Sequence, residues 1–194
     1  MMRVVLTGTT YSGKTDLLKA LGKEGYYIML EAETPIVQRL NERFGQERTR
    51  QLILGDYSRF KSIVGQRQAR LESRIVAADN PIVIQDRSAI DWIAYCKLRN
   101  AKVPHIFEEL AEQYDFKHVF FCEMLSNFDE RREEGRVMTR EEATGLNELI
   151  EIEYKTRGYR PIPVKEIHIG KKEENIAARV AYIKHFLSSS PSSS

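Results

Sequence analysis

The chain has 194 residues, of which 42% are hydrophobic, and this is enough to build one domain with a substantial core. Thirty basic residues against 28 acidic ones leave a formal net charge of +2, which excludes a general polyanion-binding surface and an acidic tail. The two cysteines, Cys96 and Cys122, lack metal-type spacing, so they predict reduced packing residues rather than a disulfide framework or a zinc site.

Short apolar runs alternate along the chain with longer segments of helical periodicity, a pattern typical of βαβ units around a parallel sheet. We therefore expect a doubly wound α/β fold with a five-stranded core. The predicted strands cover residues 3–7, 27–30, 81–85, 118–122 and 164–169. Apolar stripes at helical spacing indicate core-facing helices within residues 60–75, 143–150 and 176–187.

The first connection carries the strongest signal in the chain. Residues 8–15 read Gly-Thr-Thr-Tyr-Ser-Gly-Lys-Thr and match the complete Walker A pattern G-x-x-x-x-G-K-[ST], between a predicted strand and a predicted helix. A triphosphate must be wrapped by backbone N–H groups, which requires glycine at Gly8 and Gly13, where a Cβ would obstruct or strain the loop. The helix that starts near Gly13 then offers its free amides and the positive end of its dipole to the phosphates.

This phosphate loop predicts the nucleotide site. Lys14 is expected to bridge the outer phosphates, and Thr15 to place its hydroxyl on Mg²⁺. The alternative is an accidental glycine turn with a surface lysine, which the flanking strand and helix argue against. The expected nucleotide-binding residues are Gly8, Thr9, Thr10, Tyr11, Ser12, Gly13, Lys14 and Thr15.

The second strand ends in Glu31-Ala32-Glu33, at the carboxyl edge where open α/β sheets bind ligands. Either glutamate can activate an acceptor hydroxyl, because phosphoryl transfer asks the protein mainly to position groups and neutralise charge. Alternation puts both residues on the same side of an extended segment, so the pattern does not choose between them. We prefer Glu31, which is nearer to the strand, while Glu33 can equally serve only to favour the start of the next helix.

The third strand delivers Asp86-Arg87-Ser88 to the same edge. Asp86 can hold Mg²⁺ or its waters, or take a proton from an attacking hydroxyl, and Arg87 can clamp an anionic or polar acceptor. Alternatively, Asp86 and Arg87 form a surface ion pair. Ser88 and Asp91 predict a capping box at the start of the following helix, whether or not they also act in the site.

An arginine-rich segment lies between the fourth and fifth strands, where residues 129–136 mix acidic and basic side chains. Such a run is usually a solvated helical face. Its position after the fourth strand favours instead a helical lid, about residues 126–140, that closes over the transferring phosphoryl group, supplies charge and excludes water. We favour Arg132 and Arg136, one helical turn apart, as the lid arginines.

Two weaker signals concern other segments. Gln66, Gln68 and Arg70 on the third long helix either line an acceptor pocket or form a solvated face. Thr139 with Glu142 predicts a capping box that opens the helix after the lid.

The two ends of the chain predict its location and extent. The amino terminus runs directly into a core-type strand without the architecture of a signal peptide, and no apolar run approaches membrane-spanning length. We therefore expect a cytoplasmic protein without a membrane partner. Residues 188–194 are serine-rich with nothing to bury, which predicts a flexible tail behind a single domain of residues 1–187.

Taken in order, these features resemble the P-loop nucleoside and nucleotide kinases. The features are the phosphate loop, Glu31 at a strand end, the glutamine-bearing helix, Asp86-Arg87-Ser88 with Asp91 and Tyr95 downstream, the arginine-rich lid, and Tyr154-x-x-x-Gly158-Tyr159. The likeness covers about residues 3–187 and is nearest to the ATPase/kinase-like group that includes ribosylnicotinamide kinase. Deoxynucleoside and thymidylate kinases are more distant relatives.

The resemblance implies a three-layer P-loop NTPase fold with helices on both faces of a five-stranded parallel sheet. It also implies ATP with Mg²⁺ as donor and a small hydroxyl- or phosphate-bearing acceptor. Two departures stand out: Thr10 and Tyr11 occupy positions where many such kinases carry a further glycine, and Glu31 lacks the following proline of the deoxynucleoside kinases. Tyr11 then either stacks near the acceptor or projects outward.

Three functions follow as hypotheses. In a small-molecule kinase, Thr15 and Asp86 hold magnesium, and Asp86 or Glu31 activates the acceptor hydroxyl. Arg87 orients the acceptor, while Lys14 and the lid arginines meet the transition-state charge. The second hypothesis is an ATP-binding regulatory switch. The chain has no Asn-Lys-x-Asp sequence of the kind that reads guanine, which argues against a GTPase but not against an ATP switch. The third is a 5′-hydroxyl polynucleotide kinase, which the near-neutral charge disfavours. The acceptor, the oligomeric state and the identity of the base stay open.

Overall fold

A parallel sheet forms the centre of the molecule. The structure is a computed structural model that describes residues 1–76, 82–126, 138–167 and 171–188. Within these ranges the sheet has five strands in the order β2-β3-β1-β4-β5, all paired in parallel. The strands are β1 (Met2–Thr7), β2 (Tyr27–Met29), β3 (Ile82–Asp86), β4 (His118–Cys122) and β5 (Ile162–Val164).

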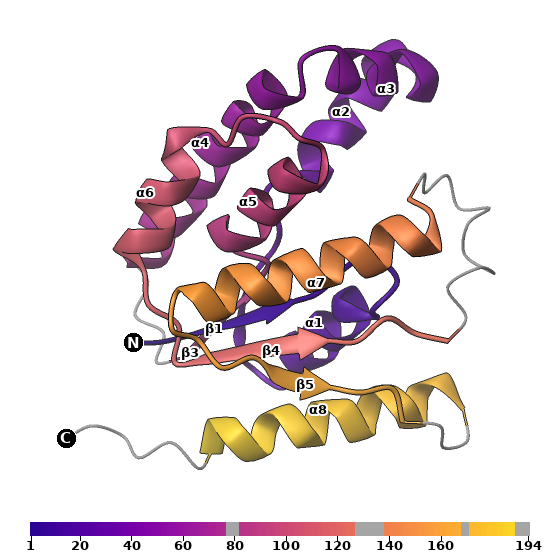
Figure 1. The fold of residues 1–194 in the computed structure, drawn as a ribbon. Helices are drawn as coiled ribbons and strands as arrows, with labels where there is room; N and C mark the ends of the chain where they lie inside the picture. Colours follow the sequence, from indigo (N-terminus) through magenta and orange to yellow (C-terminus); the bar gives the residue numbers. More distant parts are fainter. Residues whose placement is uncertain (77–81, 127–137, 168–170, 189–194) are drawn as a thin grey trace.

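Helices cover both faces of this sheet (Figure 1), which confirms the predicted three-layer α/β fold. Helices α1 and α8 lie on one face, and α4, α5, α6 and α7 lie on the other. Helices α2 and α3 lie beyond α4, at one end of the molecule. The bounds are α1 (Lys14–Lys23), α2 (Thr34–Phe44), α3 (Gln46–Gly55), α4 (Tyr57–Val76), α5 (Ala89–Leu98), α6 (His105–Gln113), α7 (Arg140–Thr156) and α8 (Lys172–Ser188).

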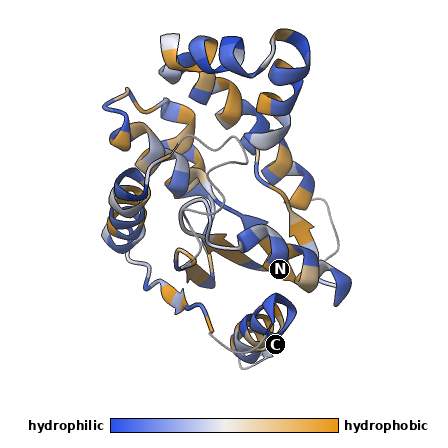
Figure 2. Ribbon diagram, turned by 90° about the vertical axis from the view of Figure 1, so that its right-hand side faces the viewer, coloured by the Kyte–Doolittle hydropathy of each residue, from blue (hydrophilic) through white to orange (hydrophobic). Residues whose placement is uncertain are grey.

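The central strand explains the layering. Val4 and Leu6 of β1 pack in the cluster with α1 and α8, whereas Val5 packs in the cluster with α5 and α7. All three side chains are fully buried, as expected for a parallel strand that is covered on both faces. The surrounding helices carry both hydrophobic and hydrophilic residues along their length (Figure 2), as amphipathic helices do.

The strand register places two predicted site segments side by side. Leu6 of β1 lies opposite Asp86 of β3, and Thr7 lies opposite Phe121 of β4. The carboxyl ends of the three central strands therefore meet at one edge of the sheet. The phosphate loop, which leaves β1 after Thr7, starts at this edge.

The predicted fifth strand is wrong in position. The sequence indicated residues 164–169, but β5 spans Ile162–Val164, and the part of the prediction at 168–169 lies outside the described residues. Pro163 sits within the strand, where proline is usually read as a terminator. Because β5 pairs only with β4, it is an edge strand, and an edge strand tolerates the missing N–H of proline.

The remaining predicted elements agree closely with the structure. The first four strands match within a residue at each end, apart from residue 81, which is not described. Both predicted capping boxes are present, at Ser88 with Asp91 and at Thr139 with Glu142. Helix α8 extends to Ser188, which the sequence assigned to the tail, and residues 189–194 lie outside the described ranges. None of the described helices is both long enough and apolar enough to cross a membrane.

The crossing of α4 and α6 generates a stability prediction. A Cβ on Gly65 would lie 2.5 Å from Ile106 Cγ2 and 3.2 Å from Phe107 Cε1, so Gly65→Ala must push the two helices apart. We expect this variant to lose about 1–3 kcal/mol of unfolding free energy, although alanine is the better helix former. The measurement is urea unfolding followed by circular dichroism.

The matched control is Gly145→Ala on α7. There the nearest side-chain atom, Leu98 Cδ1, is 4.0 Å from the new Cβ. This variant should gain about 0.5–1 kcal/mol from helix propensity alone. Equal effects of the two substitutions would contradict the close α4–α6 packing.

Candidate active site

The phosphate loop needs both of its glycines for backbone reasons. Gly8 and Gly13 have φ values of +120° and +75°, a region in which side chains are strained. A Cβ on Gly8 would also lie 2.4 Å from the carbonyl oxygen of Cys122 on β4. The loop therefore runs so close to the neighbouring strand that only glycine fits, as predicted from the motif.

The Lys14 side chain folds back over this loop. Its ammonium donates to the carbonyl oxygens of Gly8 and Thr9, at 2.8 and 2.6 Å, and to Ser12 Oγ at 2.9 Å. The side chain is buried, and this burial, together with the nearby Arg87 cation, lowers the pKa of Lys14 to about 8. An ammonium held only by neutral oxygens in a buried site favours the approach of an anion.

Further hydrogen bonds hold carbonyls of Thr9, Tyr11 and Ser12. Ser12 Oγ donates to the Thr9 carbonyl at 2.9 Å, and the Leu125 amide donates to the Tyr11 carbonyl at 3.0 Å. The Ser12 carbonyl accepts from Arg179 of α8 at 3.0 Å. These contacts hold carbonyl oxygens of the loop to protein donors, so the loop geometry is fixed from several directions.

Asp86 lies at the end of β3 with one uncommitted oxygen. The side chain is 6% exposed, and its Oδ1 is buried without a hydrogen-bond partner among the described residues. Burial raises the pKa of Asp86 from its ordinary value near 3.8 to about 6, against the opposing effect of Lys14. A buried carboxylate oxygen without a donor fits a cation or a substrate proton.

Arg87 connects the phosphate loop with the second strand. Its guanidinium donates to the Gly8 carbonyl at 2.7 Å and to Glu31 at 3.1 Å, and it lies over the Tyr95 ring at 5.1 Å. Arg87 is only 4% exposed, so the alternative of a surface ion pair with Asp86 is wrong. Its backbone has φ +63°, a strained value for a residue other than glycine.

The two glutamates after β2 have different partners. Glu31 accepts from Arg87 and from the Thr34 hydroxyl. Burial opposes its charge, but Arg87 and the Thr34 hydroxyl hold the pKa of Glu31 below its ordinary value. Glu33 pairs instead with Lys61, a fully buried lysine whose ammonium lies among aromatic rings. The structure therefore brings Glu31, and not Glu33, into contact with Arg87.

A buried hydrogen-bond cluster supports the segment that carries Asp86 and Arg87. Asp91 accepts from the Thr7 hydroxyl, the Ser88 amide and the Tyr154 hydroxyl. These donors come from the end of β1, the start of α5 and the end of α7. Ser88 and Asp91 thus act structurally at the strand ends, and the sequence did not indicate that Thr7 takes part.

The lid region is described only at its two ends. Arg132 and Arg136 lie outside the described residues, while Met138 and Arg140 lie within them. The sulfur of Met138 accepts from the hydroxyls of Thr9 and Thr10, at 3.7 and 3.9 Å. The carboxyl-terminal end of the predicted lid therefore contacts the phosphate loop.

Tyr11 and the polar residues of α4 lie in places that the sequence left open. Tyr11 does not project outward: it is 2% exposed and packs with Met124, Met138 and Ala143. Gln68 is buried against Glu72, which pairs with Arg3 near the start of β1. Gln66 and Arg70 are exposed, so these three polar residues of α4 do not form one pocket wall.

Two residues of the loop environment were missed by sequence reasoning. Asn147 of α7 accepts from the Thr9 amide at 2.9 Å, and Arg179 of α8 donates to the Ser12 carbonyl. Each is a polar residue beside an apolar helical stripe, and that is the only sequence signal that marks them. Their partners lie far away in the chain, so the motif itself does not point to them.

The magnesium prediction agrees with the chemistry of the donors present. Among the described residues no group of three or more His, Cys, Asp and Glu is arranged to hold a metal. Mg²⁺ commonly uses one or two protein oxygens together with phosphate oxygens and water. The unpartnered Asp86 oxygen and the exposed Thr15 hydroxyl at the start of α1 are suitable donors for such an ion.

A known family matches most of the chain. The family model described as "AAA domain" covers residues 3–172, which include the phosphate loop. No curated protein matches the chain.

Solved kinase structures share the fold. Thymidylate kinase from Ehrlichia chaffeensis is 15% identical with a TM-score of 0.62, and the match covers 96% of this chain and 98% of that one. Deoxyadenosine kinase from M. mycoides with dCMP and a flexible dCDP bound is 16% identical with a TM-score of 0.65, covering 97% and 100%. The same enzyme with bound dATP is 15% identical with a TM-score of 0.64, and the match covers 97% of this chain and 100% of that one. At these identities the likeness concerns the fold.

The buried Asp86 predicts a pH-dependent stability. Because its pKa is raised to about 6, the native state keeps a proton that the unfolded chain has released above about pH 4. The free energy of unfolding should therefore fall between about pH 4 and 6, on the order of 3 kcal/mol, and stay lower above that range. Asp86→Asn should lack this fall, as measured by urea unfolding without nucleotide or magnesium.

The matched control is Asp115→Asn, which changes an exposed carboxylate. Its pH profile should follow that of the unmodified protein. An Asp86→Asn profile that also follows the unmodified protein would contradict the cost of burying this charge.

Proposed function

The chain belongs to the AAA domain family and has the fold of the P-loop nucleotide kinases, and on this premise we propose that it is an ATP-dependent kinase. It transfers the γ-phosphoryl group to a small nucleoside- or nucleotide-like acceptor, in the cytoplasm. The observation that carries the proposal is the meeting of Lys14 and Arg87 on the Gly8 carbonyl, with Glu31 bound to the same arginine.

The donor side of the site consists of the phosphate loop. Amides within residues 8–15 bind the polyphosphate, while the Thr9 amide stays with Asn147. Lys14 exchanges the Gly8 and Thr9 carbonyls for phosphate oxygens. Thr15 and Asp86 would hold Mg²⁺, which would neutralise charge on the phosphates. The unpartnered oxygen of Asp86 supports this role.

The acceptor side consists of Glu31 and Arg87. Glu31, with its pKa below the ordinary value, is ionised near neutral pH and takes the proton of the acceptor hydroxyl. The acceptor oxygen bonds to the γ-phosphorus while the bond from that phosphorus to the β–γ bridging oxygen breaks, and ADP leaves. Arg87 orients both Glu31 and the acceptor. In this assignment Asp86 is a ligand of the cation and does not take the proton of the acceptor hydroxyl.

The lid completes the proposal. Arg132 and Arg136 would meet the charge on the transferring group and exclude water. The contact of Met138 with Thr9 and Thr10 supports a lid next to the phosphate loop, because Met138 directly follows the proposed arginines in the chain.

Replacing Lys14 tests the donor side. We expect Lys14→Ala to slow phosphoryl transfer from labelled ATP about a hundredfold to a thousandfold, because a charge aimed at the transferring group is lost. The control is Lys19→Ala, an exposed lysine on α1, which should leave the rate unchanged. Unaltered ATP affinity and turnover in Lys14→Ala would remove the phosphate loop from the mechanism.

The same labelled-ATP assay identifies the acceptor class. Nucleosides, nucleotides and 5′-hydroxyl oligonucleotides are offered separately, and label is expected in a nucleoside or nucleotide. Label in the oligonucleotide would indicate an end-processing kinase. Slow hydrolysis without any labelled acceptor, together with nucleotide-dependent partner binding, would indicate a regulatory switch.

A second pair of variants tests the acceptor side. Glu31→Gln should lower kcat by about a hundredfold to ten-thousandfold with little change in the KM for ATP, because the proton acceptor and the charge that faces Arg87 are lost while the phosphate loop is kept. Glu33→Gln is the matched control, since Glu33 pairs with Lys61 and has no contact with Arg87. Steady-state kinetics with the identified acceptor decide the matter, and equal losses in the two variants would argue against Glu31 as the base.

A further inference from the structure

Arg179 lies directly beneath the phosphate loop. This residue of α8 is only 2% exposed, and its Nη2 donates to the Ser12 carbonyl at 3.0 Å and to the Val164 carbonyl of β5 at 3.2 Å. Its Nη1 is 3.0 Å from the position that a Cβ on Gly13 would occupy. The guanidinium therefore holds the Ser12 carbonyl and occupies the space beside Gly13 where a side chain would lie.

The planarity of that peptide gives the contact a directional effect. In a trans peptide the carbonyl and the following N–H point in opposite directions. Since Arg179 of α8 holds the Ser12 carbonyl, the Gly13 N–H is aimed away from α8. That N–H belongs to the set of amides that the proposed function assigns to the polyphosphate.

The glycine required by the motif also makes this peptide easy to turn over. Gly13 has φ +75°, but glycine adopts positive and negative φ with similar ease, so no Cβ clash opposes a flipped peptide. A flipped peptide would present the Ser12 carbonyl oxygen to an anionic ligand, and that contact is repulsive. The orientation that directs the Gly13 N–H at the ligand therefore needs a contact from outside the loop.

We propose that Arg179 is the positioning residue that selects this orientation, an inference that rests on the proposed binding of ATP by the phosphate loop. A guanidinium suits the task because its fork of donors reaches two carbonyls at once, on the loop and on β5. Both acceptors are neutral, so its positive charge also adds to the field felt by the polyphosphate.

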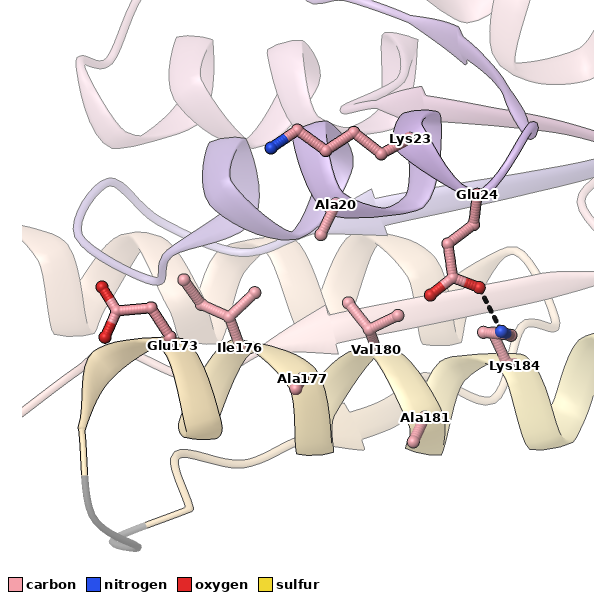
Figure 3. A pocket seen from close by; sticks show the side chains of 9 residues that line it. All are labelled: Ala20, Lys23, Glu24, Glu173, Ile176, Ala177, Val180, Ala181 and Lys184. Atoms are coloured by element: carbon pink, nitrogen blue, oxygen red, sulfur yellow. Dashed lines mark hydrogen bonds and ion pairs between the residues drawn. The ribbon is translucent and has the colours of Figure 1, made fainter.

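Helix α8, which carries Arg179, packs against α1 (Figure 3). Val180, the next residue, packs in the same core cluster as Leu17 and Leu21 of α1. Lys184 of α8 pairs with Glu24 at the end of α1. A groove of about 390 Å³ runs along this helix pair, so the contact is supported by the apolar stripe and not by a filled interface.

Two substitutions of Arg179 distinguish the effect of its hydrogen bonds on the peptide from the effect of its positive charge. Arg179→Met keeps much of the volume but no donor, and Arg179→Lys keeps the charge without the fork. We expect Arg179→Met to weaken MgATP binding about tenfold to a hundredfold in calorimetry, with adenosine binding unchanged. Arg179→Lys should recover only part of the loss. In turnover, the KM for ATP should rise while the KM for the acceptor stays constant.

Val180→Ala is the matched control, because it removes buried packing from the same stretch of α8 without touching the loop. Thermal unfolding of all variants shows which changes are losses of stability alone. If the unmodified protein does not bind MgATP, the proposed function fails and the inference falls with it. If it does bind, wild-type affinity in both Arg179 variants overturns the inference, as does an equal loss in Val180→Ala. Should Arg179→Met fail to fold, Arg179→Lys decides.

Discussion

A loop that turns its amides toward one ligand must find other partners for its carbonyl oxygens. In this protein the carbonyls of Gly8, Thr9, Tyr11 and Ser12 all accept hydrogen bonds from the rest of the chain. The donors come from α1, from the end of β3, from the residues after β4 and from α8. The order of the sheet follows from this requirement, because it brings each of those elements to the same edge.

The site that results is built for a ligand rather than for stability. Three ionisable groups, Lys14, Asp86 and Arg87, are buried at the strand ends, and burying charge is costly unless it is well compensated. The pKa of Lys14 is lowered and that of Asp86 is raised, and in each case burial is the largest cause. Both shifts favour the neutral form, so each group gains from a partner of opposite charge. The polyphosphate and cation of the proposed function would supply both partners.

Local signals in the sequence predicted much of this arrangement, and non-local contacts account for the rest. The phosphate loop, the capping boxes and the strand-end position of Asp86 are each encoded within a few residues, so they could be predicted. Glu31 and Glu33 were expected to share one side of an extended segment, but Glu33 has helical backbone angles of φ −80° and ψ −48°. The two residues therefore reach different partners, Arg87 and Lys61. The fifth strand was predicted to start at residue 164, but it includes Pro163, which an edge strand tolerates.

The bond between Arg179 and Ser12 joins residues that are 167 positions apart. During synthesis Ser12 is added 167 residues before Arg179, the residue that holds its carbonyl. A nascent chain that has formed only β1, α1 and β3 thus carries the complete motif without its final support. Loss of α8 should therefore change the phosphate loop, although the two segments lie far apart in the sequence.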